Sequence, residues 1–125
     1  MSYLLDTHVL LWWTSDAPRL SKRVADIITC SDYDVYVSAA TAWEMAIKQS
    51  VGKLNVPDNF QAMMEYNQFK RLDVTLEHAL HVAELPRLHS DPFDRLLIAQ
   101  AILEDMTLIT NDRHIRRYDV SSLET

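Results

Sequence analysis

The chain has 125 residues, a net charge of −6 and 48% hydrophobic residues, which are values typical of a globular protein rather than a disordered or fibrous one. We therefore expect residues 1–125 to form a single domain that is large enough to bury a core. The one cysteine, Cys30, excludes an internal disulfide and a cysteine-rich zinc site. The one glycine, Gly52, excludes glycine-rich phosphate loops and dinucleotide fingerprints.

The hydropathy and charge of the chain limit where in the cell the protein is expected and which partners it can bind. No apolar run is long enough to cross a membrane, and the first residues carry no basic segment of a signal peptide. We therefore expect a cytoplasmic protein with no membrane partner. A protein that binds nucleic acid only through phosphates is usually basic, so this acidic chain fits a nucleic-acid role only if several carboxylates converge on divalent cations.

Hydrophobic patterning predicts alternating strands and helices in the first half of the chain. In order, it predicts a strand at residues 2–5, a helix at 7–14, a helix at 21–31, a strand at 34–38 and a helix at 39–51. Ser21 is a suitable N-cap for the second of these helices, and Gly52 is the expected C-terminal stop of the third.

The same alternation continues in the second half. In order, we expect a helix at residues 57–67, a strand at 70–74, a helix at 75–85, a helix at 91–106, a strand at 107–110 and a short helix at 112–117. Pro57 suits the start of the first of these helices, and Pro86 ends the second. Strands separated by helices predict an α/β fold with a parallel sheet flanked by helices. Ligands of such sheets bind beyond the carboxyl ends of the strands, so polar residues there are the candidates for a site.

Four acids from separate segments are expected at that edge of the sheet. Asp6 follows the first strand, Asp112 follows the strand at 107–110, Glu44 lies in the helix after the second strand, and Asp94 lies in the first turn of the helix at 91–106. Hard divalent cations such as Mg2+ and Mn2+ prefer such oxygen ligands. Cations held in this way can polarise a phosphodiester and lower the pKa of a bound water.

Each acid also has a purely structural interpretation. Asp6 and Asp112 could be N-caps, Glu44 could pair with Lys48 one turn later, and Asp94 could favour the positive end of its helix. Asp94, however, shares its helical face with the apolar residues Leu97, Ile98, Ala101 and Ile102. A carboxylate on a buried face must be paired or hold a cation, and this favours the metal interpretation for the set.

Together these segments resemble the PIN-domain ribonucleases, and in particular the VapC-type toxins of type II toxin–antitoxin pairs. The matching segments are LLDTHVLLWW (4–13), SAATAWEMAIK (38–48), HSDPFDRLLIAQA (89–101) and TLITNDRHI (107–115), in the order found in the family. The resemblance implies a PIN-like fold in which Asp6, Glu44, Asp94 and Asp112 bind metal and carry catalysis. It implies a Mg2+- or Mn2+-dependent endoribonuclease, a homodimer and a cognate antitoxin. Residues 53–88 match no family motif.

Other polar residues near the acids are candidates for supporting roles. Candidate groups beside the acids or their bound water are Thr7, Ser38, Asp91 and Asn111, although each could instead cap a helix or form a turn, and capping is favoured for Asp91. Candidate contacts to RNA phosphates are Lys48, Arg95, Arg113, Arg116 and Arg117, which could equally lie on solvated faces.

Several histidines and aromatic residues receive no catalytic role. A surface or interface position is favoured for His78 and His81, and no role is assigned to His8, His89 and His114. The tryptophans Trp12, Trp13 and Trp43 are expected in a core or an interface. The apolar helix with Phe60, Met63, Met64 and Tyr66 could close the core or bind a protein.

Rival functions differ in the residues that they require. A phosphoacceptor receiver domain would need adjacent acids after the first strand, and a haloacid-dehalogenase-like phosphatase would need a second aspartate at position 8, where this chain has His8. Two alternatives to the toxin nuclease stay open. They are a catalytically weak PIN-like module that binds metal for structure, and a housekeeping RNA-processing nuclease without an antitoxin.

Overall fold

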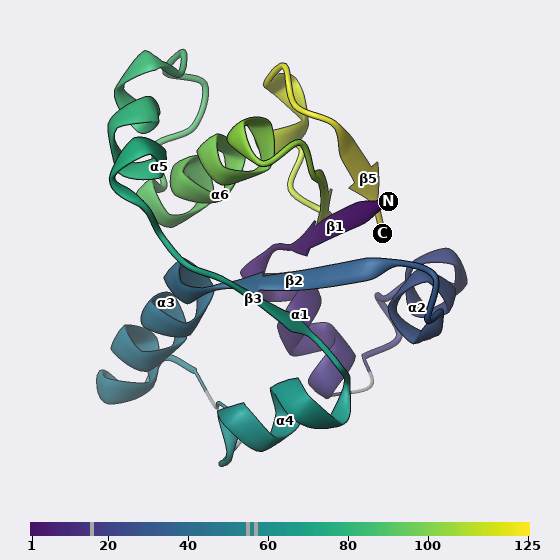
Figure 1. Cartoon of the computed structure of the whole chain (residues 1–125). Helices are drawn as coiled ribbons and strands as arrows, with labels where there is room; N and C mark the ends of the chain where they lie inside the picture. The colour runs from purple at the N-terminus through teal and green to yellow at the C-terminus, as the bar shows by residue number, and fades with distance from the viewer. Residues whose placement is uncertain (16, 55, 57) are drawn as a thin grey trace.

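The computed structural model describes every residue of the chain except 16, 55 and 57. In the described part, all strand pairs are parallel and form one sheet in the order β3-β2-β1-β4-β5 (Figure 1). The strands are β1 (Ser2–Leu5), β2 (Asp34–Ser38), β3 (Lys70–Leu72), β4 (Thr107–Thr110) and β5 (Ser122–Glu124). The predicted α/β class with a parallel sheet is confirmed.

Helices connect the strands. They are α1 (Thr7–Thr14), α2 (Lys22–Thr29), α3 (Ala39–Ser50), α4 (Phe60–Tyr66), α5 (Leu76–His81) and α6 (Pro92–Leu103), with 3₁₀ turns η1 (Val82–Glu84) and η2 (Ile115–Arg117). Ser21 caps α2, as predicted, and Gly52 adopts a φ of 74° after α3.

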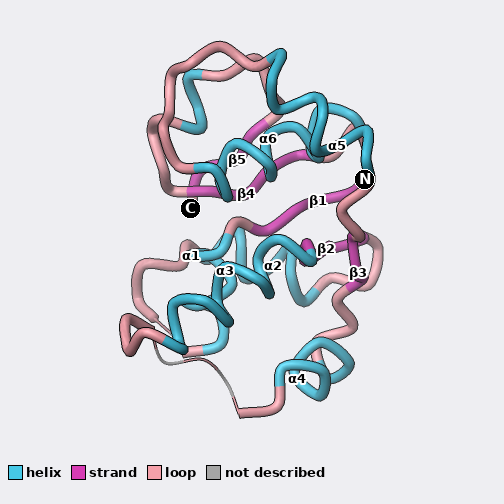
Figure 2. The backbone as a smooth tube through the Cα atoms, turned by 90° about the vertical axis from the view of Figure 1, so that its left-hand side faces the viewer, coloured by secondary structure: helices cyan, strands magenta, loops and turns pink. Residues whose placement is uncertain are grey.

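The sheet separates two apolar clusters, because alternate residues of a strand point to opposite faces. Tyr3 and Leu5 of β1 pack in one cluster with residues of α1, α2 and α4, whereas Leu4 packs in the other with residues of α6. Figures 1 and 2 accordingly show α5 and α6 on one side of the sheet and α1, α2 and α4 on the other. Burial on both faces explains why these strands read as continuous apolar runs.

Several predicted boundaries were wrong. The edge strand β5 was missed because Ser122–Glu124 is short and neither alternating nor apolar, and the strand predicted at 70–74 ends at Leu72. The helix predicted at 75–85 becomes α5 and then η1, and the one predicted at 112–117 is only η2. The helix predicted to reach residue 106 ends at Leu103, since Asp105 turns back with a φ of 54°.

Pro57, the predicted start of the fourth helix, lies outside the described residues. The described helix α4 begins at Phe60 and is capped by Asn59. In the part of the chain that is described, no helix has the length and apolar character to span a bilayer.

Candidate metal centre

The two central strands bring Asp6 and Asp112 to one edge of the sheet. Asp6 directly follows β1, and its backbone N–H donates to the Ile109 carbonyl of β4 at 3.1 Å. Thr110, the last residue of β4, donates its hydroxyl to Asp6 Oδ2 and accepts the Asp112 backbone N–H at 2.9 Å. Thr110 thus links the two acidic segments.

Asp94 meets Asp112 through a histidine. His89 Nε2 lies 2.8 Å from Asp94 Oδ2 and 3.3 Å from Asp112 Oδ2. One ligand atom from each of these three side chains lies within 4.8 Å of the other two. The hydroxyl of Tyr118 holds this loop in place by accepting the backbone N–H of Leu88 and of His89.

Glu44 reaches the same region from α3 and is only 2% exposed. Thr7, the residue after Asp6, donates its hydroxyl to Glu44 Oε1 at 2.6 Å. Lys48 pairs with Glu44 Oε2 at 2.6 Å. This hydrogen bond is the main cause that raises the pKa of Lys48, and the charges of Asp91 and Asp94 raise it further. The Lys48 ammonium therefore lies in the field of acids from both α3 and α6.

Burial disfavours the charged form of two of the carboxyls. It raises the pKa of Asp94 to about 7, with further upward contributions from the charges of Asp91 and Asp6 and opposing ones from His89. Burial also raises the pKa of Asp6, against the hydrogen bonds from Thr110 and Val9. These shifts are those of an acidic site short of positive charge, and the donors are oxygens with one imidazole nitrogen. This donor set fits a hard divalent cation.

Capping and ligation are not exclusive for these acids. Asp6 accepts the Val9 N–H at 2.8 Å as the N-cap of α1, although its other oxygen faces Thr110. Asp112 likewise accepts the His114 N–H at 2.8 Å. Asp91 caps α6 through the N–H groups of Phe93 and Asp94, as the sequence favoured.

The other candidate supporting residues have different surroundings. Of these, Thr7 donates to Glu44, whereas the hydroxyl of Ser38 donates to Gln100 Oε1 at 2.6 Å and so binds no carboxylate. Asn111 is exposed at the end of β4.

The basic candidates also differ in what they contact. The guanidinium of Arg95 donates to the carbonyls of Val82 and Pro86 and to the Tyr118 hydroxyl, so its hydrogen bonds serve the fold. Arg116 pairs with Glu124 at 2.9 Å. Both Arg113 and Arg117 are exposed near the acids.

Sequence reasoning missed His89 and Thr110. The signal for Thr110 was its place as the last strand residue before the Asn111-Asp112 pair, the position that also drew attention to Ser38. His89 had no comparable signal, because its contact with Asp112 depends on how the loop before α6 folds back.

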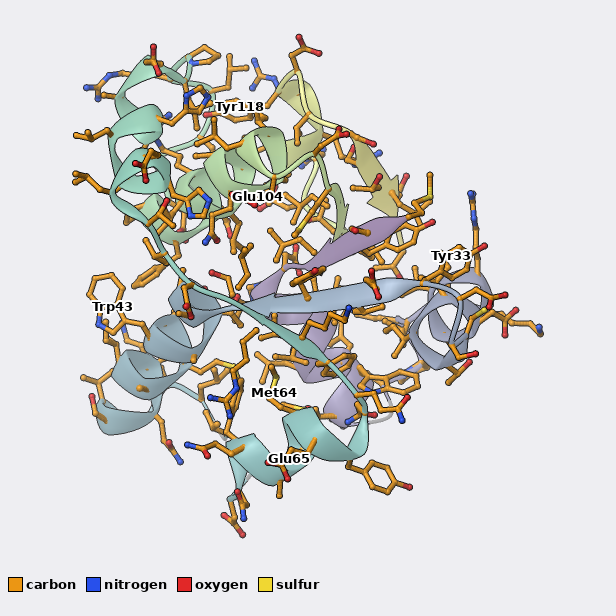
Figure 3. All side chains as sticks on the ribbon, in the orientation of Figure 1. Tyr33, Trp43, Met64, Glu65, Glu104 and Tyr118 are labelled. Carbon is orange, nitrogen blue, oxygen red and sulfur yellow. The ribbon has the colours of Figure 1, made fainter. Side chains whose placement is uncertain are left out.

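Two further histidines and the aromatic residues that were weighed separately have other surroundings. The surface or interface position favoured for His78 is wrong, because its side chain is buried and pairs with Glu104. His81 pairs with Glu84, so the two histidines form no joint site. The apolar residues Trp12, Trp13, Phe60, Met63 and Met64 belong to or pack against the first core cluster. The helix α4 therefore closes the core, apart from Tyr66, which is 88% exposed. Trp43 is exposed and stacks edge-on against Phe93 (Figure 3).

Comparisons with known proteins agree with this architecture. The family model of the PIN domain matches residues 3–121. The chain is 30% identical over 118 residues to Ribonuclease VapC22 of Mycobacterium tuberculosis, covering 92% of this chain and 90% of the relative.

Similar solved structures support the fold. One is VapBC2 from Rickettsia felis bound to a DNA fragment from its promoter, with a TM-score of 0.75, 17% identity and coverage of 100% of this chain and 99% of the other. Another is DNA-bound VapBC from Salmonella typhimurium, with a TM-score of 0.71, 17% identity and coverage of 99% and 98%.

Proposed function

The chain belongs to the PIN-domain family, and on this premise we propose that it is a VapC-type endoribonuclease, the toxin of a toxin–antitoxin pair. Residues 1–125 are proposed to form a single PIN domain. PIN-domain nucleases generally depend on divalent metals, and we assign Mg2+ or Mn2+ as the metal of this chain. The observation that carries the proposal is the cluster of His89, Asp94 and Asp112, whose ligand atoms lie within 4.8 Å of one another, with Asp6 linked to Asp112 through Thr110.

The carboxylates of Asp6, Glu44, Asp94 and Asp112 would hold the metal. A bound divalent cation would polarise the phosphodiester, lower the pKa of an attacking water and stabilise the leaving oxygen. Glu44 is held in place by Thr7 and Lys48, and Asp6 by Thr110. His89 spans Asp94 and Asp112, so its imidazole is a candidate to shift when a cation joins these two acids.

RNA is the proposed substrate, and exposed basic side chains beside the acids would bind its phosphates. Arg113 and Arg117 are the best placed of the basic candidates, since Arg95 and Arg116 already have intramolecular partners. Lys48 is held by Glu44 and sits 34% exposed, so its ammonium can reach both the carboxylate and a nearby phosphate.

The test is cleavage of a structured RNA by the purified protein. Cleavage should require Mg2+ or Mn2+ and stop when EDTA is added. Asp94→Asn and Asp112→Asn should each lower the rate by at least about a hundredfold, because each removes an anionic ligand. Asp91→Asn is the matched control, since asparagine caps helices as well as aspartate does, and its loss should be much smaller.

Outcomes against the proposal are specific. Undiminished cleavage in excess EDTA would contradict the metal mechanism. Metal binding without any RNA cleavage would instead favour a catalytically weak interaction module.

A cognate antitoxin is the proposed protein partner. The similar solved structures are VapBC complexes, and the chain carries exposed apolar side chains that a partner or a second copy could cover. We also propose a homodimer. Co-purification with the product of an adjacent small gene would support the toxin assignment, whereas RNA cleavage without such a gene would favour a housekeeping nuclease.

A further inference from the structure

Two contacts fix how α3 lies against α6. Ser38, the N-cap of α3, donates to Gln100 of α6, and the ring of Trp43 stacks on Phe93 with centroids 5.2 Å apart. From the first contact to the second, the residue number increases in α3 and decreases in α6, so the two helices are antiparallel where they meet. Figure 3 shows Trp43 beside α3, at the end of the sheet where β2 passes into that helix.

This register brings two of the proposed metal ligands to the same level along the two helices. Glu44 directly follows Trp43, and Asp94 directly follows Phe93. Glu44 lies six residues after Ser38, and Asp94 lies six residues before Gln100. Six residues span about 9 Å along a helix, at 1.5 Å per residue. A slip of one helix along the other would therefore change the separation of Glu44 and Asp94.

Gln100 is fully buried, with 0% of its surface exposed. Its Oε1 accepts the Ser38 hydroxyl at 2.6 Å, and its Nε2 donates to the Asp73 carbonyl at 3.3 Å. Nε2 also lies 3.4 Å from Nδ1 of the buried His78. A buried amide is costly unless its partners are in place, so these partners fix both its orientation and the position of α6.

We propose that Gln100 is a positioning residue for the metal centre: by holding Ser38 it keeps α3 and α6 in the register that brings Glu44 and Asp94 to the same level along the two helices. This inference rests on the proposed function, because it takes those two acids as ligands. Gln100 touches neither acid and acts only through the two helices. Its loss should therefore weaken metal binding without removing a ligand.

The experiment measures Mn2+ binding to the full chain by calorimetry in parallel with its melting temperature. Gln100→Met keeps the side-chain length and removes the amide's hydrogen bonds to Ser38, Asp73 and His78, and should weaken Mn2+ binding about tenfold. Ser38→Ala should weaken it as well. The double variant should bind little more weakly than the weaker-binding single variant, because the bond between Ser38 and Gln100 is lost in both single variants.

Controls separate positioning from general destabilisation. Val24→Ala truncates a buried residue of α2, which lies at the other end of the sheet from α3 in Figure 1. It should lower the melting temperature yet leave the Mn2+ Kd within about twofold, as ordinary for distant independent sites. Gln100→Glu keeps an oxygen that can accept from Ser38, and should recover part of the Mn2+ affinity lost in Gln100→Met.

The outcomes distinguish the two proposals. If Gln100→Met melts lower but binds Mn2+ within twofold of wild type, the positioning role is overturned and the metal centre stands. If the wild type and Asp94→Asn bind Mn2+ equally, the four-acid centre fails, and the inference fails with it. Additive losses in Ser38→Ala and Gln100→Met would overturn the Ser38–Gln100 bond as the common cause.

Discussion

At Asp94, folding disfavours the charged form of the carboxyl, whereas metal binding requires that form. Its carboxyl is largely buried next to Asp91, and burial raises its pKa to about 7. Near neutral pH, the metal-free fold must therefore either keep a proton on this group or bear an uncompensated charge. A ligand with this property destabilises the protein that carries it until a cation is bound.

The first prediction concerns Asp94→Asn in the metal-free protein. The folded-state pKa is raised above the unfolded value of 3.8, so the native state binds more protons between about pH 4 and 7. The free energy of unfolding of the wild type should therefore fall as pH rises through that window. Asparagine cannot ionise, so the variant should be roughly 2–4 kcal/mol more stable than wild type at pH 8 and nearly equal to it at pH 4.

Urea unfolding in EDTA at the two pH values measures this difference. Asp91→Asn serves as the control, because it preserves the cap of α6 but leaves Asp94 ionisable. A variant that is no more stable than wild type at pH 8 would show that the Asp94 charge is already compensated.

At the scale of elements, the sequence predicted what is continuous and local. The strands at 2–5, 34–38 and 107–110 were predicted with the bounds that the structure has, because each is a compact run buried on both faces. The three-residue β5 and the break between α5 and η1 carry no such pattern, since they are decided by tertiary contacts. Strand order likewise had no local signal.

In the candidate site, too, local sequence patterns were predictive, whereas tertiary contacts could not be predicted. The sequence pattern named Asp6 and Asp112 because each follows a strand, Asp94 because it lies in the first turn of a helix, and Glu44 because it lies in the helix after the second strand. The interactions that join them could not be predicted, since His89 meets Asp112 across a folded loop and Ser38 meets Gln100 across 62 positions. For the same reason Arg95 was named as an RNA contact, although its guanidinium ties α6 to the segment after α5.

The second prediction separates Arg95 from Arg113. Arg95→Lys should lower the free energy of unfolding by about 1–3 kcal/mol. The ammonium of lysine cannot make all the hydrogen bonds that the Arg95 guanidinium donates to Val82, Pro86 and Tyr118. Arg113→Gln, at an exposed position, should change stability by less than about 0.5 kcal/mol.

RNA binding should respond in the opposite order. Asp94→Asn is included in these variants to prevent cleavage. In this background, Arg113→Gln should weaken RNA affinity and lower the slope of log affinity against log salt concentration by about one. Arg95→Lys should leave that salt slope unchanged. If Arg95→Lys lowers the slope and Arg113→Gln does not, the assignment of the two residues must be exchanged.

At the scale of the whole molecule, apolar surface remains uncovered on α3 and α5. Leu76 and Leu80, one turn apart on α5, are 71% and 64% exposed, and Trp43 on α3 is 60% exposed. Apolar patches of this kind on a protein surface commonly mark protein–protein contacts. They lie outside α4, the helix whose apolar residues mostly close the core.

The third prediction follows from this surface. The purified chain should be a dimer at micromolar concentration by light scattering, because burying these side chains against a second copy removes them from water. Leu80→Glu places a charge in the patch and should shift the mass toward the monomer. A wild type that is monomeric under these conditions and has no co-purifying partner would contradict both the dimer and the antitoxin assignment.

The net charge of −6 connects the acidic site to the pH dependence of the whole protein. Without a cation, the site concentrates negative charge, and protons can bind its carboxyl oxygens in place of a metal ion. Metal binding must displace those protons, because carboxylate ligands have to be deprotonated. The carboxyls that would hold the metal therefore also make its affinity depend on pH.

The fourth prediction is that the apparent Kd for Mg2+ tightens as pH rises from 5 to 8. The pKa of Asp94 is raised to about 7 in the metal-free protein, so a proton competes with the metal below that pH. For one competing proton, affinity should rise up to about tenfold per pH unit below 7 and level off above it.

Calorimetric titration in two buffers of different ionisation enthalpy measures both the Kd and the proton released. Additional Mg2+ should restore part of the RNA cleavage rate at pH 5.5, since mass action favours metal over proton. A Kd independent of pH from 5 to 8, with no proton released, would mean that the acids at this edge of the sheet do not form the metal-binding group.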